Sequence, residues 1–235
     1  MKTWKKNLHL PFHGTSRSSG LLCVAFGTAS LVCLSGVLVG CGERGGGSPK
    51  ADFHPDPARP VPGIVATEPE HIPPDTVACV PSLTGEGRAH PANVSDPAAP
   101  RITLNVPDGW TSVAGSGDTA SILTGPDGMT AKVTITPTDL PPDRAFLGYT
   151  SALRGSAPGF NFSIAGDPFC GYSSELLTGT LRGSSGAIQF ADRITHIWTN
   201  TKQYLVAIHL EGPTGVAGFS VAKSALMQNF AIVIP

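Results

Sequence analysis

Ala187-Ile-Gln-Phe-Ala-Asp-Arg-Ile-Thr-His-Ile-Trp198 and Gln203-Tyr-Leu-Val-Ala-Ile-His-Leu-Glu211 are two neighbouring runs of the 235-residue chain, separated by four residues. Both runs are rich in β-branched and aromatic residues, and apolar side chains recur at every second position. This composition and this period are typical of half-buried β-strands, and the short connection predicts an antiparallel hairpin. The sequence around this hairpin extends the same pattern.

The register of the hairpin is predicted from its hydrophobic pattern. If Trp198 lies opposite Tyr204 across a three-residue loop, Ile194 lies opposite Ile208, and nearly all the large apolar groups share one face. A slip by one residue mixes the two faces, so the pattern favours the first register.

Charged residues of this hairpin form a candidate polar site. In the favoured register Arg193, His209 and Glu211 share the face that lacks the large apolar groups. With their neighbour in sequence, they give a candidate cluster near one sheet edge: Asp192, Arg193, His209 and Glu211. The alternative is an ordinary solvated sheet face, because exposed charges often pair without any function. His196, among packing residues, is interpreted as a satisfied core histidine.

Further strands and two helices are predicted between residues 101 and 235. The strand patterns cover residues 101–106, 119–124, 129–136, 160–169, 172–182 and 231–234. The helical patterns cover residues 142–155 and 216–230. Two helices packed on one antiparallel sheet make an α+β sandwich.

The N-terminal 40 residues are typical of an export signal. Four basic residues precede an uncharged run over residues 20–40, and no acidic residue comes before Glu43. The run ends in Leu38-Val39-Gly40-Cys41, which resembles the bacterial lipoprotein signal. That resemblance implies cleavage before Cys41, a diacylglycerol group on its sulfur and often an acylated amine. The alternative is an uncleaved membrane anchor, because 21 uncharged residues are long enough to span a bilayer.

Residues 41–72 are predicted to be a flexible tether, and residues 73–235 the globular domain. Residues 41–100 hold 12 of the 22 prolines and few large apolar residues, too few to offset the entropy of ordering. His54, His71 and His90 of this region are expected to be solvated. Without residues 1–40, the remaining 12 Lys and Arg against 17 Asp and Glu give a net charge of −5. This balance argues against nucleic-acid binding, so the expected contact is with the membrane, through the lipid anchor.

Cys79 and Cys170 are the two cysteines that remain apart from Cys41. In an exported protein an even pair predicts a disulfide, whereas a reactive thiol pair normally has a closer spacing. Closing a loop of about 90 residues stabilises a domain by roughly 4 kcal/mol in the chain-entropy model.

The order of motifs after residue 100 resembles one known family, the LpqN/LpqT-type mycobacterial lipoproteins. The resemblance rests on Ile102-Thr-Leu-Asn-Val-Pro-Asp-Gly-Trp110, on Ala157-Pro-Gly-Phe160 after the first helix, on the long hairpin, and on a terminal helix ending in Ile-Val-Ile-Pro235. It implies a PsbP-like α/β/α sandwich and a binding role in the cell envelope, linked to envelope lipids. It brings no catalytic residue, and neither a cofactor nor a metal is expected.

The sequence leaves three functions open. The first is a lipid-anchored envelope protein that binds or scaffolds protein partners through an exposed patch. The second is a carrier of a lipid or glycolipid, in a cavity between sheet and helix. Its candidate lining residues are Trp110, Phe160, Trp198 and Tyr204. The third is a hydrolase without a sequence motif, with Ser or Asp, His and an acid gathered around His209. We expect a non-catalytic binding module.

Overall fold

The computed structural model describes residues 61–65, 73–79, 87–156, 161–183 and 186–235. The predicted signal peptide, Cys41, His54, His71 and Phe160 lie outside the described residues, as does most of the predicted tether. No helix in the described ranges is long and apolar enough to cross a membrane.

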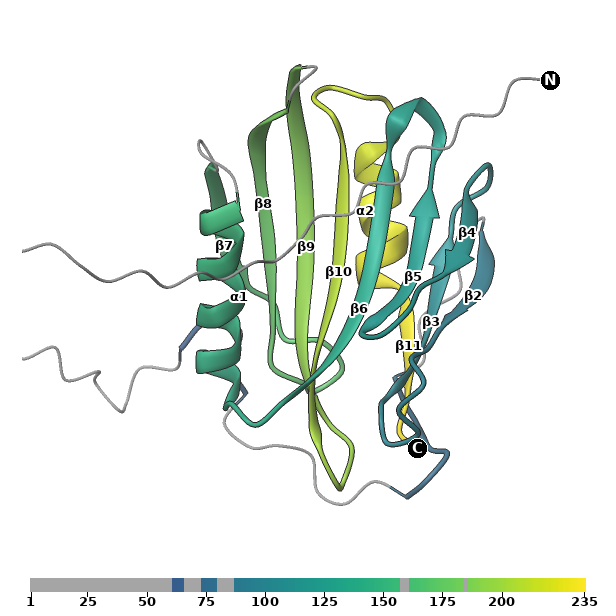
Figure 1. Ribbon diagram of the computed structural model, residues 1–235, viewed down its shortest axis with the longest axis vertical. Coiled ribbons are helices and arrows are strands. Elements are labelled where there is room, and N and C mark those ends of the chain that lie inside the picture. Colours follow the sequence, from purple (N-terminus) through teal and green to yellow (C-terminus); the bar gives the residue numbers. More distant parts are fainter. Residues whose placement is uncertain (1–60, 66–72, 80–86, 157–160, 184–185) are drawn as a thin grey trace, which may run out of the picture. The chain divides into compact units, whose positions relative to one another are not determined.

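A seven-stranded antiparallel sheet forms the centre of the fold (Figure 1). Its strand order is β4-β5-β6-β10-β9-β8-β7. The strands are β4 (Thr111–Ala114), β5 (Thr119–Thr124), β6 (Thr130–Thr138), β7 (Asn161–Gly166), β8 (Ser174–Gly183), β9 (Gly186–Trp198) and β10 (Gln203–Pro213). The predicted hairpin is β9–β10, and the connection between β5 and β6 contains the short 3₁₀ helix η1 (Pro126–Gly128).

A second antiparallel sheet has four strands, in the order β1-β11-β3-β2. They are β1 (Val77–Cys79), β2 (Arg88–Ala92), β3 (Arg101–Val106) and β11 (Phe230–Val233). The prediction of a single sheet was therefore too simple, although the α+β class is correct. Strand β2 was missed because it contains Pro91 in a proline-rich region; β2 is an edge strand, where a proline is tolerated.

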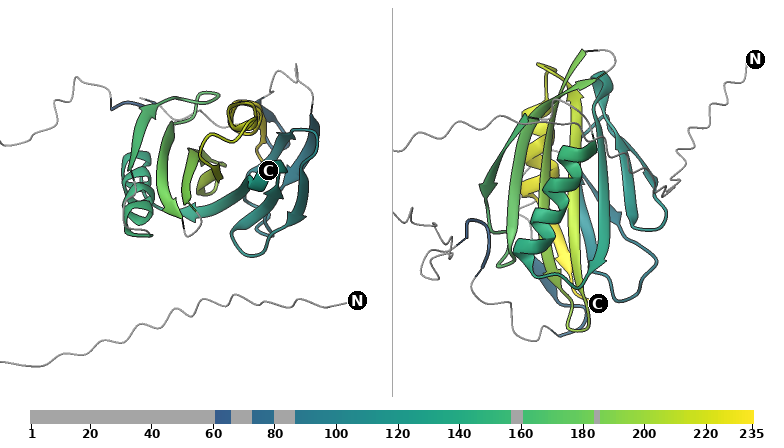
Figure 2. Two further views of the ribbon diagram at one scale, coloured as in Figure 1. Left: turned by 90° about the horizontal axis from the view of Figure 1, so that it is seen from above. Right: turned by 60° about the vertical axis from the view of Figure 1, so that its left-hand side comes forward.

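The two helices lie on opposite faces of the large sheet. Helix α1 (Pro142–Ser156) packs on one face, here called the outer face, and α2 (Phe219–Gln228) packs on the other, the inner face. Viewed from above, α2 lies between the two sheets (Figure 2). The main hydrophobic core fills the inner side, and a smaller core around Phe146, Leu177 and Ile194 lies under α1.

The predicted register of the β9–β10 hairpin is wrong by one residue. Trp198 lies opposite Gln203, and Tyr204 opposite Ile197. The hydrophobic pattern selects a register only when a single face is buried, and here both faces of the hairpin are covered.

The turn between β9 and β10 explains the observed register. The Thr199 amide donates to the Lys202 carbonyl at 2.9 Å, which leaves a two-residue turn at Asn200 and Thr201. Asn200 has a φ of 67°, in the left-handed region that asparagine tolerates better than most residues. Two-residue hairpin turns require a positive φ at a central residue, which Asn200 supplies, and this turn fixes the pairing of the two strands.

The predicted disulfide between Cys79 and Cys170 is present. It spans 91 residues with a Cα–Cα distance of 5.6 Å, and it ties β1 to the loop before β8. In the same loop the Phe169 ring stacks on Phe230 of β11 at a centroid distance of 4.2 Å. This loop therefore joins the two sheets.

His90 is not solvated, contrary to the expectation for the proline-rich region. It lies on β2, half-buried, with Nε2 2.9 Å from the Ser121 hydroxyl and Nδ1 3.3 Å from the Ser112 hydroxyl. Burial, and then the charge of Arg88, lower the pKa of His90. The side chain connects the small sheet to strands β4 and β5 of the large one.

Candidate functional site

A pocket of about 360 Å³ lies between α1 and the outer face of the large sheet. Helix α1 and strands β6, β8 and β10 provide its walls, because one side of the helix and alternate side chains of each strand are directed to it. The lining residues are Lys132, Thr134, Tyr149, Leu153, Ser156, Leu181, Ala207, His209 and Glu211. A second pocket of about 290 Å³ is also lined by Glu211, together with Gly212 and Pro213.

The polar wall of the pocket is organised around His209. Its Nδ1 lies 2.5 Å from a carboxylate oxygen of Asp192, the residue directly opposite on β9. Its Nε2 lies 3.5 Å from a carboxylate oxygen of Glu211. Asp192 is fully buried, while 23% of the His209 side chain and 40% of the Glu211 side chain are exposed. The ring is thus held between a buried carboxylate and an accessible one.

These contacts keep His209 protonated at neutral pH. Burial alone lowers the pKa of His209, but the hydrogen bonds to Asp192 and Glu211, and the charges of both carboxylates, raise it to about 9. The hydrogen bond to His209 in turn lowers the pKa of Glu211, against the opposing effect of burial. With Asp192 neutralising His209, Glu211 adds a negative charge to the polar wall.

Tyr149 of α1 closes the pocket above Asp192. Its hydroxyl is near enough to sense the Asp192 charge, yet Oδ2 of Asp192 has no hydrogen bond of ordinary geometry with the described residues. Burial, and then the charge of Asp192, raise the pKa of Tyr149 far above its usual range. Tyr149 therefore stays a neutral hydroxyl.

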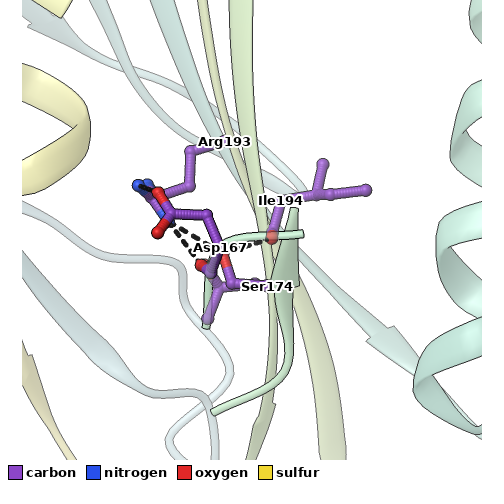
Figure 3. Close-up of polar contacts among 5 residues, drawn as sticks. Asp167, Ser174, Arg193 and Ile194 are labelled. Carbon is purple, nitrogen blue, oxygen red and sulfur yellow. Dashed lines mark hydrogen bonds and ion pairs between the residues drawn. The ribbon is translucent and has the colours of Figure 1, made fainter. Parts of the chain in front are cut away.

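Three of the four residues of the predicted polar cluster contact one another on the pocket side of the sheet, where His209 and Glu211 line the pocket, and the fourth does not. Asp192, His209 and Glu211 share the outer face, but Arg193 points to the inner face (Figure 3). There its guanidinium donates to the Asp167 carboxylate at 2.5 Å and to the Ser174 hydroxyl at 3.1 Å. The correction follows from the one-residue register error, because neighbouring residues of a strand point to opposite faces.

The predicted aromatic lining residues do not form one cavity. Trp110 is buried in the main core, and Trp198 is half-buried at the end of β9. Tyr204 is buried on the inner face, where its hydroxyl donates to Asp96 at 2.9 Å. None of the three lines the pocket under α1. His196, by contrast, is buried as predicted, with Nε2 3.0 Å from the Leu140 carbonyl oxygen.

Sequence reasoning missed Lys132 and Tyr149 as residues of the site. Lys132 lies directly opposite His209 on β6, a pairing between strands that are distant in sequence. Tyr149 belongs to the apolar side of α1 and gave no polar signal. Within the described ranges, no group of three or more His, Cys, Asp or Glu is placed to hold a metal ion.

No protein-family profile matches the chain, and no curated protein sequence matches it. Among solved structures, that of LpqN, involved in cell envelope biogenesis of Mycobacterium tuberculosis, is similar with a TM-score of 0.52 and 19% identity. The match covers 62% of this chain and 91% of LpqN. The two chains therefore share a fold, as the motif order predicted.

Two further structures score lower. The Saccharomyces cerevisiae Ran-binding protein Mog1p gives a TM-score of 0.38 at 12% identity, over 62% of this chain and 95% of Mog1p. A protein of Bacteroides thetaiotaomicron gives 0.31 at 10% identity, over 55% of this chain and 44% of its own. Neither score is high enough to bear on the fold.

Proposed function

We propose that this chain is an exported, lipid-anchored protein of the cell envelope that acts as a non-catalytic binding module. Its ligand site is the pocket between α1 and the outer face of the large sheet. The volume of about 360 Å³ falls in the range of small-molecule sites, and the lining combines apolar walls with a few polar groups.

The contacts of His209 with two carboxylates are the observation that carries a binding role. A general base must be unprotonated near the working pH, and a histidine with a pKa of about 9 is not. Both ring nitrogens are also directed at carboxylates instead of a nucleophile. Ser156, the serine on the pocket wall, donates its hydroxyl to the Leu153 carbonyl at 2.8 Å. This arrangement favours binding over hydrolysis.

Two separate features support the envelope as the location. Cys41 follows a sequence that resembles the lipoprotein signal, and the fold is that of LpqN, whose described involvement is in cell envelope biogenesis. We extend this to membership of the LpqN/LpqT-type lipoproteins. Attachment then requires two or more acyl chains, because one chain gives only reversible membrane binding.

A carrier of a lipid or glycolipid is the second candidate. The pocket lies between sheet and helix, as a carrier requires, and Leu153, Leu181 and Ala207 give it an apolar side. An acyl chain of the lipid would pack on this apolar side, and the polar wall of the pocket suits the lipid head group. For the scaffolding of protein partners, in contrast, the described residues form no exposed patch that is as clearly delimited as this pocket.

Native mass spectrometry of the protein purified from a related host tests the binding function. We expect a retained small molecule in the wild type and its loss in Leu153→Trp, which fills the pocket. Leu147→Trp is the matched control, because Leu147 lies on the same helix but is 53% exposed and does not line the pocket. The proposal would be overturned if the purified protein carried no small molecule and also bound none of the small molecules or lipids added to it.

A further inference from the structure

Two opposite charges face the pocket without forming an ion pair. Lys132 lies on β6 directly opposite His209, and Glu211 lies two residues further along β10 on the same face. The charge of Lys132 lowers the pKa of Glu211, so the two groups sense each other. Nevertheless, Lys132 forms no ion pair with any residue that the structure describes.

His209 and Glu211 also have partners within the protein. His209 is balanced by the buried Asp192. One oxygen of Glu211 accepts a hydrogen bond from the Thr130 hydroxyl at 3.3 Å, and the other lies 3.5 Å from Nε2 of His209. The Glu211 side chain nevertheless stays 40% exposed, and it lines the pocket together with Lys132. The wall therefore offers one positive and one negative group, Lys132 and Glu211, within one pocket.

We infer that the pocket binds a zwitterion, with its acidic oxyanion on Lys132 and its ammonium on Glu211. An apolar substituent of the ligand packs against Leu153 and Leu181, on the opposite side of the pocket. This inference rests on the proposed binding function and names the chemical class of its ligand.

Charge complementarity selects the zwitterion over other ligands. A simple anion meets the Glu211 carboxylate, and a simple cation meets Lys132, so each suffers a repulsion that the zwitterion avoids. A neutral ligand covers both charges and removes water from them without replacing it by an opposite charge. Only a ligand with both charges satisfies Lys132 and Glu211 together.

An aminoalkyl phosphate has this chemistry, either as a lipid head group or as a free metabolite. Isothermal titration calorimetry of the purified protein with three probes separates the cases. The probes are dihexanoyl phosphatidylethanolamine, dihexanoyl phosphatidylglycerol with the same chains and a purely anionic head, and free O-phosphoethanolamine. We expect the ethanolamine lipid to bind about tenfold more tightly than the glycerol lipid, as one lost charge contact predicts.

Charge-removing substitutions give the sharper readout. Lys132→Gln and Glu211→Gln should each weaken binding of the ethanolamine lipid about tenfold. Glu211→Gln should in addition strengthen binding of the glycerol lipid, because the repulsion is gone. Lys223→Gln on α2 is the matched control and should change neither affinity. Free O-phosphoethanolamine binding as well as the lipid points to a soluble zwitterion, and weaker binding points to a lipid.

Three results overturn the inference: equal affinities for the two lipids, no effect of Lys132→Gln or Glu211→Gln, or no binding of any probe. The proposed function fails separately. A retained molecule of another class that disappears in Leu153→Trp leaves the binding function in place and removes only the zwitterion.

Discussion

Asp192 and Arg193 are neighbours on β9, both almost fully buried, yet they belong to different parts of the molecule. On the inner face, Arg193 binds Asp167 and Ser174, and its guanidinium lies 5.1 Å from the centre of the Phe169 ring. On the outer face, Asp192 contacts His209, which lines the pocket. The two buried charges differ in what their partners do: His209 lines a pocket, whereas Asp167 and Ser174 hold the loop before β8 in place.

The largest effect is expected from the disulfide that secures the inner-face loop. Replacing both cysteines, Cys79→Ser with Cys170→Ser, should lower the free energy of unfolding by about 4 kcal/mol. Without the bridge, which spans 91 residues, the unfolded chain is no longer held in a closed loop and gains conformational entropy. Urea denaturation measures the loss. Binding at the outer pocket should survive under native conditions, and its disappearance would show that the two regions are coupled.

Arg193→Ala should be the next largest change. It leaves the Asp167 carbonyl and the Ser174 hydroxyl without a buried donor and opens a cavity over Phe169, so we expect a loss of about 3 kcal/mol. The control is Asp167→Asn, which keeps a hydrogen-bond acceptor on a side chain that is 47% exposed. It should cost clearly less; equal losses would mean that the ion pair, and not the burial of Arg193, secures the loop.

The strands and helices were predictable because they depend on local alternation and helical periodicity. Strands β3 and β5 match the predicted bounds, and α1 differs by one residue at its end. The faces of β9 and β10 were not predictable from hydrophobicity, because a sheet covered on both sides carries apolar residues at both parities. The turn residue Asn200 held the missing information.

The candidate site was only partly predictable, for a related reason. Asp192, His209 and Glu211 lie on one hairpin, so sequence proximity was enough to group them. Lys132 joins them through the pairing of β6 with β10, which lie far apart in sequence. Such a pairing leaves no local signature, and the interpretation of Arg193 failed with the register.

The next largest effect is expected in the pH dependence of stability, to which His209 contributes on the outer face only. The pKa of His209 is about 9 in the folded protein and about 6.5 unfolded. Its contribution, about 2 kcal/mol after allowance for partial exposure, is therefore fully present below pH 6.5 and is lost as the pH rises through 9. Urea denaturation at pH 6 and pH 9.5 measures this difference.

Asp192→Asn tests the cause of that dependence. The substitution removes the buried charge that holds the proton on His209, so the loss of stability between pH 6 and pH 9.5 should shrink. Arg193→Ala should leave it unchanged, because Arg193 lies on the other face. An unchanged pH dependence in Asp192→Asn would mean that Glu211 alone keeps His209 protonated.

The smallest effects should have opposite signs on the two faces. Tyr172 is buried in the main core, and its hydroxyl has no hydrogen-bond partner among the described residues, so burial raises its pKa to about 12. Tyr172→Phe removes an unsatisfied polar group and should stabilise the protein by up to about 1 kcal/mol. Tyr149→Phe removes the hydroxyl beside Asp192 and should destabilise it by a similar amount. Both volumes are nearly conserved, so thermal unfolding of the two variants isolates the hydroxyl. A Tyr149→Phe variant that is as stable as the wild type, or more stable, would mean that Asp192 does not need the Tyr149 hydroxyl.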